Sequence, residues 1–223
     1  MRVIFELRRM SVAATLILAA AMAMPALPAA ASLQKLVYQV QHPRYGDIGT
    51  LTNAIDKNGE QTTVTSEGKF RVSILGIALY RQDFTRVEQW AGERLMSFHG
   101  VTNVNGRMTE VSGAAEGDHF VVNSPNGTES APATVRIANP WSMATLKGDT
   151  MMTPDRGLLE TVYANAGEMT SIPIKGKMVK ARHYEINRPS GERRYDVWFD
   201  DQGMPVKFSV NGRNGLVTFT LVS

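Results

Sequence analysis

Apolar and polar side chains alternate along most of this chain, and turn sequences interrupt the alternation about every ten residues. Leu36, Tyr38 and Val40 alternate with Gln39 and Gln41 where the pattern begins. A period of two places one side of a strand on a core and the other side in water. The pattern therefore predicts an all-β protein.

Turn sequences that favour hairpins separate the predicted strands. Asn58-Gly59, Asn105-Gly106 and Asn126-Gly127 are examples, and the first is typical of a type I′ turn because both residues tolerate a positive φ. Strands joined by such short turns run antiparallel. The predicted strands are 36–41, 48–55, 70–74, 77–90, 94–104, 107–115, 119–124, 158–165, 169–174, 179–187, 193–199, 205–210 and 216–222.

No long amphipathic helix is predicted in residues 32–223, which argues against a parallel α/β architecture. The segment Asn139 to Arg156 breaks the alternation and is predicted to be a short helix or an ordered loop. Because a large antiparallel sheet tends to curl, we expect an open barrel or half-barrel with this segment covering one mouth or edge. The expected organisation is a single domain over residues 32–223.

Met1 to Ala31 has the features of a signal peptide that is removed on export. Arginines precede an apolar stretch over residues 10–24, and Ala29-x-Ala31 is a small-residue cleavage site. We expect a mature chain that begins near Ser32 and is periplasmic or secreted. A retained anchor is the alternative, but the stretch is short for a bilayer span, which needs roughly 20 strongly apolar residues. We therefore expect no membrane-spanning segment.

The charge and cysteine content of the chain exclude several functions. The whole chain has 24 basic and 21 acidic residues and no cysteine. Removal of the signal segment, with its three arginines and one glutamate, leaves 192 residues with 21 basic and 20 acidic side chains. So small an excess argues against nucleic acid as a partner. Without cysteine there is no lipid attachment through a thioether, no catalytic thiol and no iron–sulfur site.

Several motifs occur together in the order of one protein family. They are Leu36–Val40, Gly46-x-Ile48-Gly49, Trp90–Leu95, Asn139-Pro140-Trp141, Asp196–Lys207 and Thr218-Phe219-x-Leu221. The chain resembles a family of exported bacterial all-β proteins whose domain has no known function. The resemblance covers nearly all of the mature chain and implies an all-β envelope protein. It supplies no catalytic residues, because its motifs are turn glycines and strand aromatics.

The residues that most often carry catalysis or bind metals are not arranged for either in the sequence. No two of the histidines, His42, His99, His119 and His183, are separated by two or four positions, although a metal site built from distant strands stays open. No serine lies in a Gly-x-Ser-x-Gly motif. Asp200 and Asp201 precede Gly203 and are better explained by a turn than by acid–base catalysis. We predict no enzyme activity, no metal site and no cofactor.

Large apolar side chains offer a wall for a ligand cavity. A curled sheet can enclose an apolar ligand, and methionine suits an adaptable wall. The same side chains would equally fill a dry core. The predicted cavity residues are Trp90, Trp141, Met143, Met151, Met152 and Trp198.

A local excess of basic residues lies between Lys175 and Arg194. Lys180, Arg182, Arg193 and Arg194 form a patch for an anionic envelope partner if neighbouring strands align them on one face. The alternative is a solvated outer face.

We therefore expect an exported envelope protein that binds an apolar or amphipathic ligand such as a lipid. The second hypothesis is a structural or interaction protein that meets an envelope protein through the basic strands.

Overall fold

The computed structural model describes residues 32–212 and 215–223, with the backbone alone at Arg193 and Arg194. The predicted signal segment, residues 1–31, lies outside the described residues. The chain is all-β, as the alternation predicts. The strands are β1 (Ser32–His42), β2 (Gly46–Asn58), β3 (Gln61–Ile74), β4 (Ile77–Ala91), β5 (Arg94–Val104), β6 (Arg107–Glu116), β7 (His119–Ser124), β8 (Gly127–Pro132), β9 (Arg136–Ile137), β10 (Thr150–Met152), β11 (Leu159–Thr161), β12 (Tyr163–Ala164), β13 (Glu168–Ile174), β14 (Lys177–Asn187), β15 (Arg193–Phe199), β16 (Pro205–Gly212) and β17 (Gly215–Leu221).

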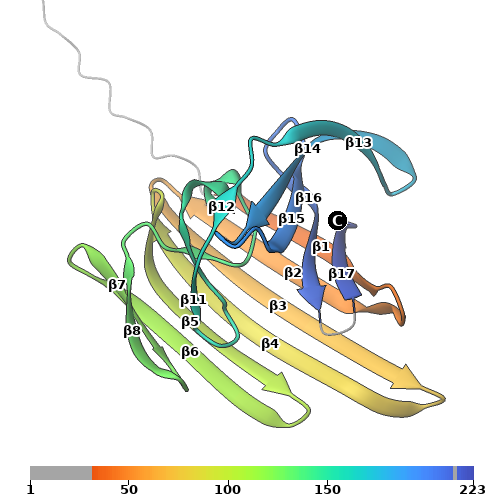
Figure 1. Cartoon of the computed structure of the whole chain (residues 1–223), viewed down its shortest axis with the longest axis horizontal. Helices are drawn as coiled ribbons and strands as arrows, with labels where there is room; N and C mark the ends of the chain where they lie inside the picture. The colour runs from red at the N-terminus through yellow and green to blue at the C-terminus, as the bar shows by residue number, and fades with distance from the viewer. Residues whose placement is uncertain (1–31, 213–214) are drawn as a thin grey trace, which may run out of the picture.

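Fourteen of these strands form one antiparallel sheet (Figure 1). Its order is β12-β14-β15-β16-β17-β1-β2-β3-β4-β5-β6-β7-β8, and β13 pairs with β14. The first strand of the chain lies inside the sheet, because β1 pairs with β2 on one side and with β17 on the other, where Tyr38 is opposite Leu221. The two ends of this order, β8 and β12, are not paired with each other in the described part of the chain.

The segment between β8 and β12 crosses from one half of the sheet to the other. It contains the 3₁₀ helix η1 (Met143–Lys147) and a small sheet of β9, β10 and β11, in which β9 and β10 are parallel. The predicted strand 158–165 is divided here into β11 and β12. The backbone N–H of Val162, between the two strands, donates to the Asp149 carbonyl at 2.8 Å in the register of β10 and β11, whereas β12 pairs with β14 of the large sheet. Among the described residues no helix is long and apolar enough to cross a membrane.

The apolar residues of the alternation gather on one face of the sheet, here called the core face. It carries fully buried Tyr38, Val40 and Val64 and, on the C-terminal strands, Val197 and Phe199. Phe219 of β17 stacks on Phe208 of β16 with ring centroids 4.3 Å apart, and it meets the Phe70 ring of β3 edge-on at 6.0 Å. Aromatic packing therefore joins strands from the two ends of the chain.

Two-residue hairpin loops connect many of the long strands, but not always with the predicted turn. Asn105 and Gly106 both have positive φ, of 53° and 90°, as a type I′ turn requires. At the predicted type I′ turn of Asn58-Gly59, by contrast, Asn58 pairs with Gln61, so the loop residues are Gly59 and Glu60. Among these only Gly59 has a positive φ, which fits type II′ instead.

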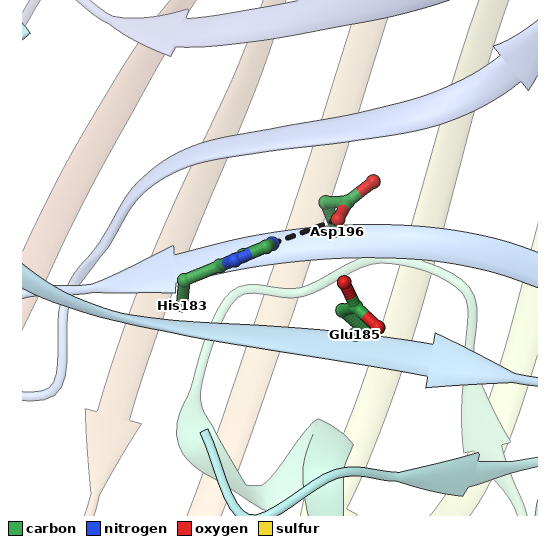
Figure 2. A group of neighbouring side chains, drawn as sticks. All are labelled: His183, Glu185 and Asp196. Atoms are coloured by element: carbon green, nitrogen blue, oxygen red, sulfur yellow. Dashed lines mark hydrogen bonds and ion pairs between the residues drawn. The ribbon is translucent and has the colours of Figure 1, made fainter. Parts of the chain in front are cut away.

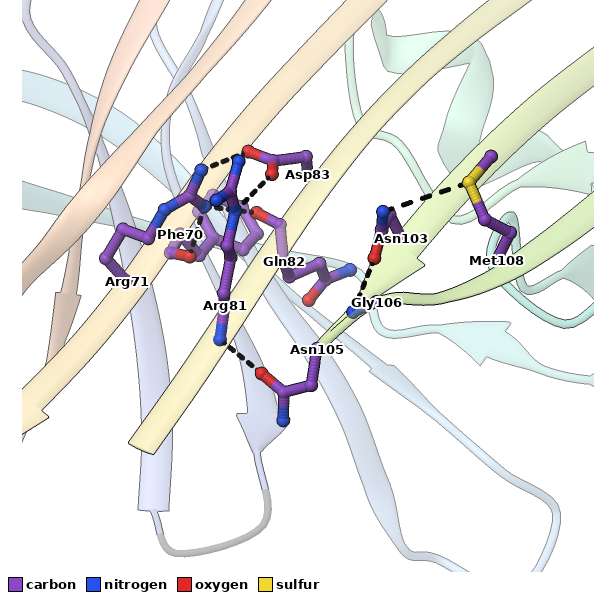
Figure 3. Close-up of polar contacts among 9 residues, drawn as sticks. All are labelled: Phe70, Arg71, Arg81, Gln82, Asp83, Asn103, Asn105, Gly106 and Met108. Carbon is purple, nitrogen blue, oxygen red and sulfur yellow. Dashed lines mark hydrogen bonds and ion pairs between the residues drawn. The ribbon is translucent and has the colours of Figure 1, made fainter. Parts of the chain in front are cut away.

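Charged side chains occupy the opposite face of β3 and β4. Asp83 accepts from the Arg71 Nη2 at 2.5 Å and from the Arg81 Nε at 2.9 Å (Figure 3). Beside them the Asn105 amide oxygen accepts from the Arg81 backbone N–H at 2.8 Å. These contacts tie the β3–β4 ribbon to the neighbouring β5–β6 turn.

Candidate functional site

A group of polar side chains is buried on the core face. Glu88 of β4 is fully buried, and it lies beside Ser66 of β3 and Asn53 of β2, which are buried as well. Asn139, from the segment after β9, donates through Nδ2 to Glu88 Oε1 at 2.8 Å and to Ser66 Oγ at 3.0 Å. The Asn139 Oδ1 accepts from the Asn53 amide at 3.1 Å. These bonds fix the segment that holds Asn139 on the core face.

Two tryptophans complete the surroundings of Glu88. Trp90 Nε1 and Trp141 Nε1 each donate to Glu88 Oε2 at 3.0 Å, and the two indole rings meet edge-on with centroids 5.8 Å apart. Burial raises the pKa of Glu88, while the hydrogen bonds from Asn139, Trp90 and Trp141 act in the opposite direction. The sequence Asn139-Pro140-Trp141 therefore has a structural role, because two of its side chains bind one buried carboxyl group.

Next to this polar group lies a cavity of about 260 Å³. Its wall is formed by β2–β4, by β15–β17 and by residues of the connecting segment. Aromatic rings from both halves of the sheet line it, but polar atoms form somewhat more of its surface than apolar atoms do. The lining residues include Leu51, Phe70, Phe84, Phe208, Val210 and Phe219, together with the polar residues Gln82, Arg86, Asn139, Asp155, Tyr195 and Asn211.

Arg86 is the buried cation of this cavity, with 9% of its surface exposed. Its Cζ lies 3.7 Å from the centroid of the Phe84 ring, and its Nε has no hydrogen-bond partner among the described residues. Burial lowers the pKa of Arg86 to about 10, and the charges of Asp155 and Glu88 act against this shift. The guanidinium group is therefore still a cation at neutral pH.

A second group of polar side chains, His183, Glu185 and Asp196, lies on the opposite face of the sheet (Figure 2). His183 Nε2 is 2.7 Å from Asp196 Oδ1, and the ligand atoms of all three residues lie within 4.8 Å of one another. Imidazole nitrogen and carboxylate oxygen are both ligands of divalent metal ions. This group is therefore the one with the donors to hold a metal among the described residues.

None of the six residues predicted to line a cavity contributes to the 260 Å³ cavity. Trp90 and Trp141 bind Glu88 beside it, and Met151 and Met152 are buried in the core. Met143 is exposed. Trp198 lies on the opposite face, stacked on the His183 ring with centroids 4.3 Å apart, because its neighbours Val197 and Phe199 point into the core.

The predicted basic patch is described only in part. Lys180 and Arg182 are exposed and two positions apart on β14, so they project from the same side of that strand. The Arg182 guanidinium donates to the Gly167 carbonyl at 3.3 Å. The side chains of Arg193 and Arg194 lie outside the described part of the chain. The patch stays a prediction.

The sequence contains a recognisable feature for each of these two polar groups. Phe84 and Trp90 fall on one face of a period-two strand, so Arg86 and Glu88 occupy the core positions between two aromatic residues. His183 and Glu185 are two positions apart on one predicted strand, which places both on one face. Asp196 joins them only through the pairing of β14 with β15, which the sequence does not specify.

The fold and these sites define a large antiparallel β protein with a polar cavity in its core. A crystal structure from Brucella abortus, a beta-barrel-like protein of domain of unknown function DUF1849, is similar with a TM-score of 0.59. The two sequences are 12% identical over 86% of this chain and 96% of that one, so the likeness concerns the fold alone. The model of the domain of unknown function DUF6134 matches residues 44–222, and the chain belongs to that family. None of the curated proteins matches it.

Proposed function

We propose that the protein is an exported binding protein that holds a small amphipathic anion in the 260 Å³ cavity. The observation that carries this proposal is Arg86, a buried cation whose Nε has no partner among the described residues, in a wall that also carries several phenylalanine rings. An unsatisfied buried polar group costs about 1–3 kcal/mol, more for a charged one. A ligand with an anionic head and an apolar body would satisfy the guanidinium and fill the aromatic part of the wall.

We also propose that the sheet bends around the ligand as an open barrel. In support of this bend, Phe70 of β3 reaches the Phe219 ring although two strands lie between β3 and β17 in the sheet. The segment with Asn139 and Asp155 would then cover one side of the cavity, since both residues line it.

Export is the other part of the proposal. It is supported by the signal-like sequence of residues 1–31. Cleavage after Ala31 would leave every described strand of the sheet complete. Fractionation of the native cells and N-terminal sequencing of the protein test this part. A chain that keeps residues 1–31 in the cytosol would contradict it.

The ligand proposal is tested with two fluorescent probes that share one aromatic skeleton. 1-Anilinonaphthalene-8-sulfonate carries an anionic sulfonate, and N-phenyl-1-naphthylamine lacks it. We expect Arg86→Met to weaken binding of the sulfonate at least tenfold, since a hydrogen bond to a charged group contributes roughly 1.5–3 kcal/mol, and to leave the neutral probe within twofold. Equal affinity of Arg86→Met and wild type for the sulfonate would refute the role of Arg86.

A second variant keeps the test decisive if Arg86→Met fails to fold. Val210 lines the cavity and is only partly buried, so Val210→Phe fills part of the space with little disturbance elsewhere. Both probes should then bind more weakly. Unchanged binding of both probes would place them outside this cavity and would overturn the proposal.

A further inference from the structure

We propose that His183, Glu185 and Asp196 bind a divalent transition-metal ion on the face of the sheet opposite the core (Figure 2). One nitrogen and two carboxylate oxygens lie within 4.8 Å of one another. Zinc takes such ligands at about 2.0–2.2 Å, which separates neighbouring ligand atoms of a tetrahedral site by roughly 3.4 Å. Small side-chain rotations would bring the three groups to this spacing.

The pairing of two strands brings the three residues together. Glu185 of β14 is directly opposite Asp196 of β15, and His183 precedes Glu185 by two positions on the same side of β14. A site on paired strands of a wide sheet has a rigid backbone, so the ligands are held close to their binding positions before an ion arrives.

Neighbouring side chains orient two of the ligands. Ser209 Oγ donates to Asp196 Oδ2 at 3.3 Å, on the carboxylate oxygen that does not face His183. The His183 ring lies parallel to the Trp198 ring, with an angle of 7° between their planes. Outer contacts of this kind fix the direction of metal ligands and raise metal affinity.

The donor set also suits the charge and geometry of the ion. Two carboxylates compensate its double positive charge, and three protein ligands leave a fourth position for water. Thiolate, the softer ligand that selects copper(I), is absent from a chain without cysteine. Zinc is therefore a suitable probe.

A pair elsewhere in the sheet provides a matched control. His99 Nε2 lies 3.0 Å from Glu110 Oε1 across β5 and β6, which resembles the His183–Asp196 contact. Both of these side chains are exposed, and no third ligand group accompanies them among the described residues. If His183 and Asp196 were only a hydrogen-bonded pair, the two pairs would behave alike toward zinc.

The test is calorimetric titration of the mature chain with zinc chloride. We expect one equivalent to bind, His183→Gln and Glu185→Gln each to weaken binding at least tenfold, and His99→Gln to leave it within twofold. Glu185 is partly exposed, so Glu185→Gln decides the question if the other variant does not fold. No saturable binding by the wild type, or equal binding by both site variants and the wild type, would overturn the proposal.

The tip of the β3–β4 hairpin extends beyond the strands on either side of it. Pairing of β3 with β2 ends at Phe70, and pairing of β4 with β5 begins at Gln82, so the residues between them form a two-stranded ribbon at the edge of Figure 1. Four aliphatic side chains are exposed there. They are Ile74 at 44%, Leu75 at 97%, Ile77 at 67% and Leu79 at 50%.

Exposure of these four aliphatic side chains to water is energetically unfavourable. Leu75 has a φ of 50°, a conformation that favours glycine or asparagine, and its side chain buries almost nothing. Folding therefore does not account for a leucine at this position. Strain that folding does not require is typical of functional sites.

Charges behind the tip favour an anionic lipid surface as its partner. Arg71 and Arg81 lie on the ribbon, with Asp83 as the carboxylate bound to both, and Lys69 precedes the ribbon on β3. We infer that the tip inserts its aliphatic side chains into the interface of an anionic membrane while these cations face the headgroups.

Flotation with lipid vesicles tests this inference. The mature protein should float with vesicles of phosphatidylglycerol and phosphatidylcholine, and Leu75→Asn combined with Ile77→Ser should lower the bound fraction at least tenfold. Leu33→Asn is the control, because Leu33 is also highly exposed but lies at the other end of the paired strands. Equal flotation of the tip variant and the control, or a tip-dependent dimer without flotation, would contradict the inference.

Discussion

At the scale of single residues, Asn139 holds the connecting segment on the core face. Its amide is bonded to Asn53, Ser66 and Glu88, all of which are buried. We predict that Asn139→Ala lowers the free energy of unfolding by about 3 kcal/mol, because it leaves buried polar groups without partners. Urea unfolding followed by tryptophan fluorescence measures this loss.

The control for Asn139 is an asparagine with a single exposed contact. Asn126 donates to the Arg156 carbonyl at 3.0 Å on the surface. Asn126→Ala should change the free energy of unfolding by less than about 0.5 kcal/mol. Similar losses of free energy of unfolding for the two variants would show that the buried hydrogen bonds of Asn139 stabilise the fold no more than one exposed hydrogen bond.

Asp83 gives a prediction about pH. Hydrogen bonds from Arg71 and then from Arg81 hold the pKa of Asp83 below its ordinary value of 3.8 (Figure 3). A lowered pKa in the folded state means that this carboxylate stabilises the fold above its ordinary pKa, and that the contribution is lost as the pH falls through the lowered value. Arg71→Gln should return the pKa toward 3.8, as followed by NMR titration of the carboxyl carbon. A pKa that does not move would contradict the assignment.

The sequence predicts which residues of a strand share a face, but not what lies opposite them. The alternation around Trp198 placed it correctly on a strand, yet two buried neighbours direct it away from the core. Arg86 and Glu88 can be recognised from the sequence as charged residues at core positions of the alternation. Asn139, which binds Glu88, and Tyr195, which lines the cavity with Arg86, come from distant parts of the chain, and only the tertiary packing brings them near.

At the scale of elements, the β3–β4 turn is less stable than it could be. Leu75 and Gly76 both have positive φ, and asparagine is favoured over leucine at the first position of a type I′ turn. Leu75→Asn should therefore raise the free energy of unfolding by about 1 kcal/mol. Thermal unfolding is the measurement. Ile77→Asn, at a position without positive φ, should give no such gain, and equal effects of the two would refute the explanation.

Most long strands were predicted well because their alternation extends over many residues, but only residues 70–74 of β3 were predicted. The predicted ranges 94–104 and 119–124 coincide with β5 and β7. Short strands were predicted less well, since two or three residues do not establish a period. In the small sheet, β11 lies within the predicted strand 158–165, but β9 and β10 were not predicted, because they are parallel and depend on contacts between segments far apart in sequence.

At the scale of the whole molecule, the first and last strands of the described residues, β1 and β17, lie side by side. The pairing of β1 with β17 connects Tyr38 to Leu221, and the Tyr38 hydroxyl donates to the Pro205 carbonyl at 2.8 Å. Period-two alternation gives the faces of strands and the hairpins between them, but it does not say which strands meet after the last hairpin. The position of β1 inside the sheet could therefore not be predicted from the sequence. Pairings so distant in the chain also make folding slow.

Phe219 makes this long-range packing testable. Its ring contacts Phe208 of the neighbouring strand and Phe70 of β3, so it joins the last strand to the first third of the chain. Phe219→Ala should lower the free energy of unfolding by about 3–5 kcal/mol. If the contact with β3 forms early, much of this loss should appear as slower refolding in stopped-flow measurements.

Phe120 of β7 is the comparison for Phe219. It is fully buried, and its strand pairs only with β6 and β8, its neighbours in sequence. Phe120→Ala should cost a similar free energy of unfolding, but its effect should appear mainly as faster unfolding, because a strand near the end of the sheet can join after the centre has formed. Refolding slowed equally by both variants would mean that the two ends of the sheet form together, and that the meeting of β1 with β17 is not the step that limits folding.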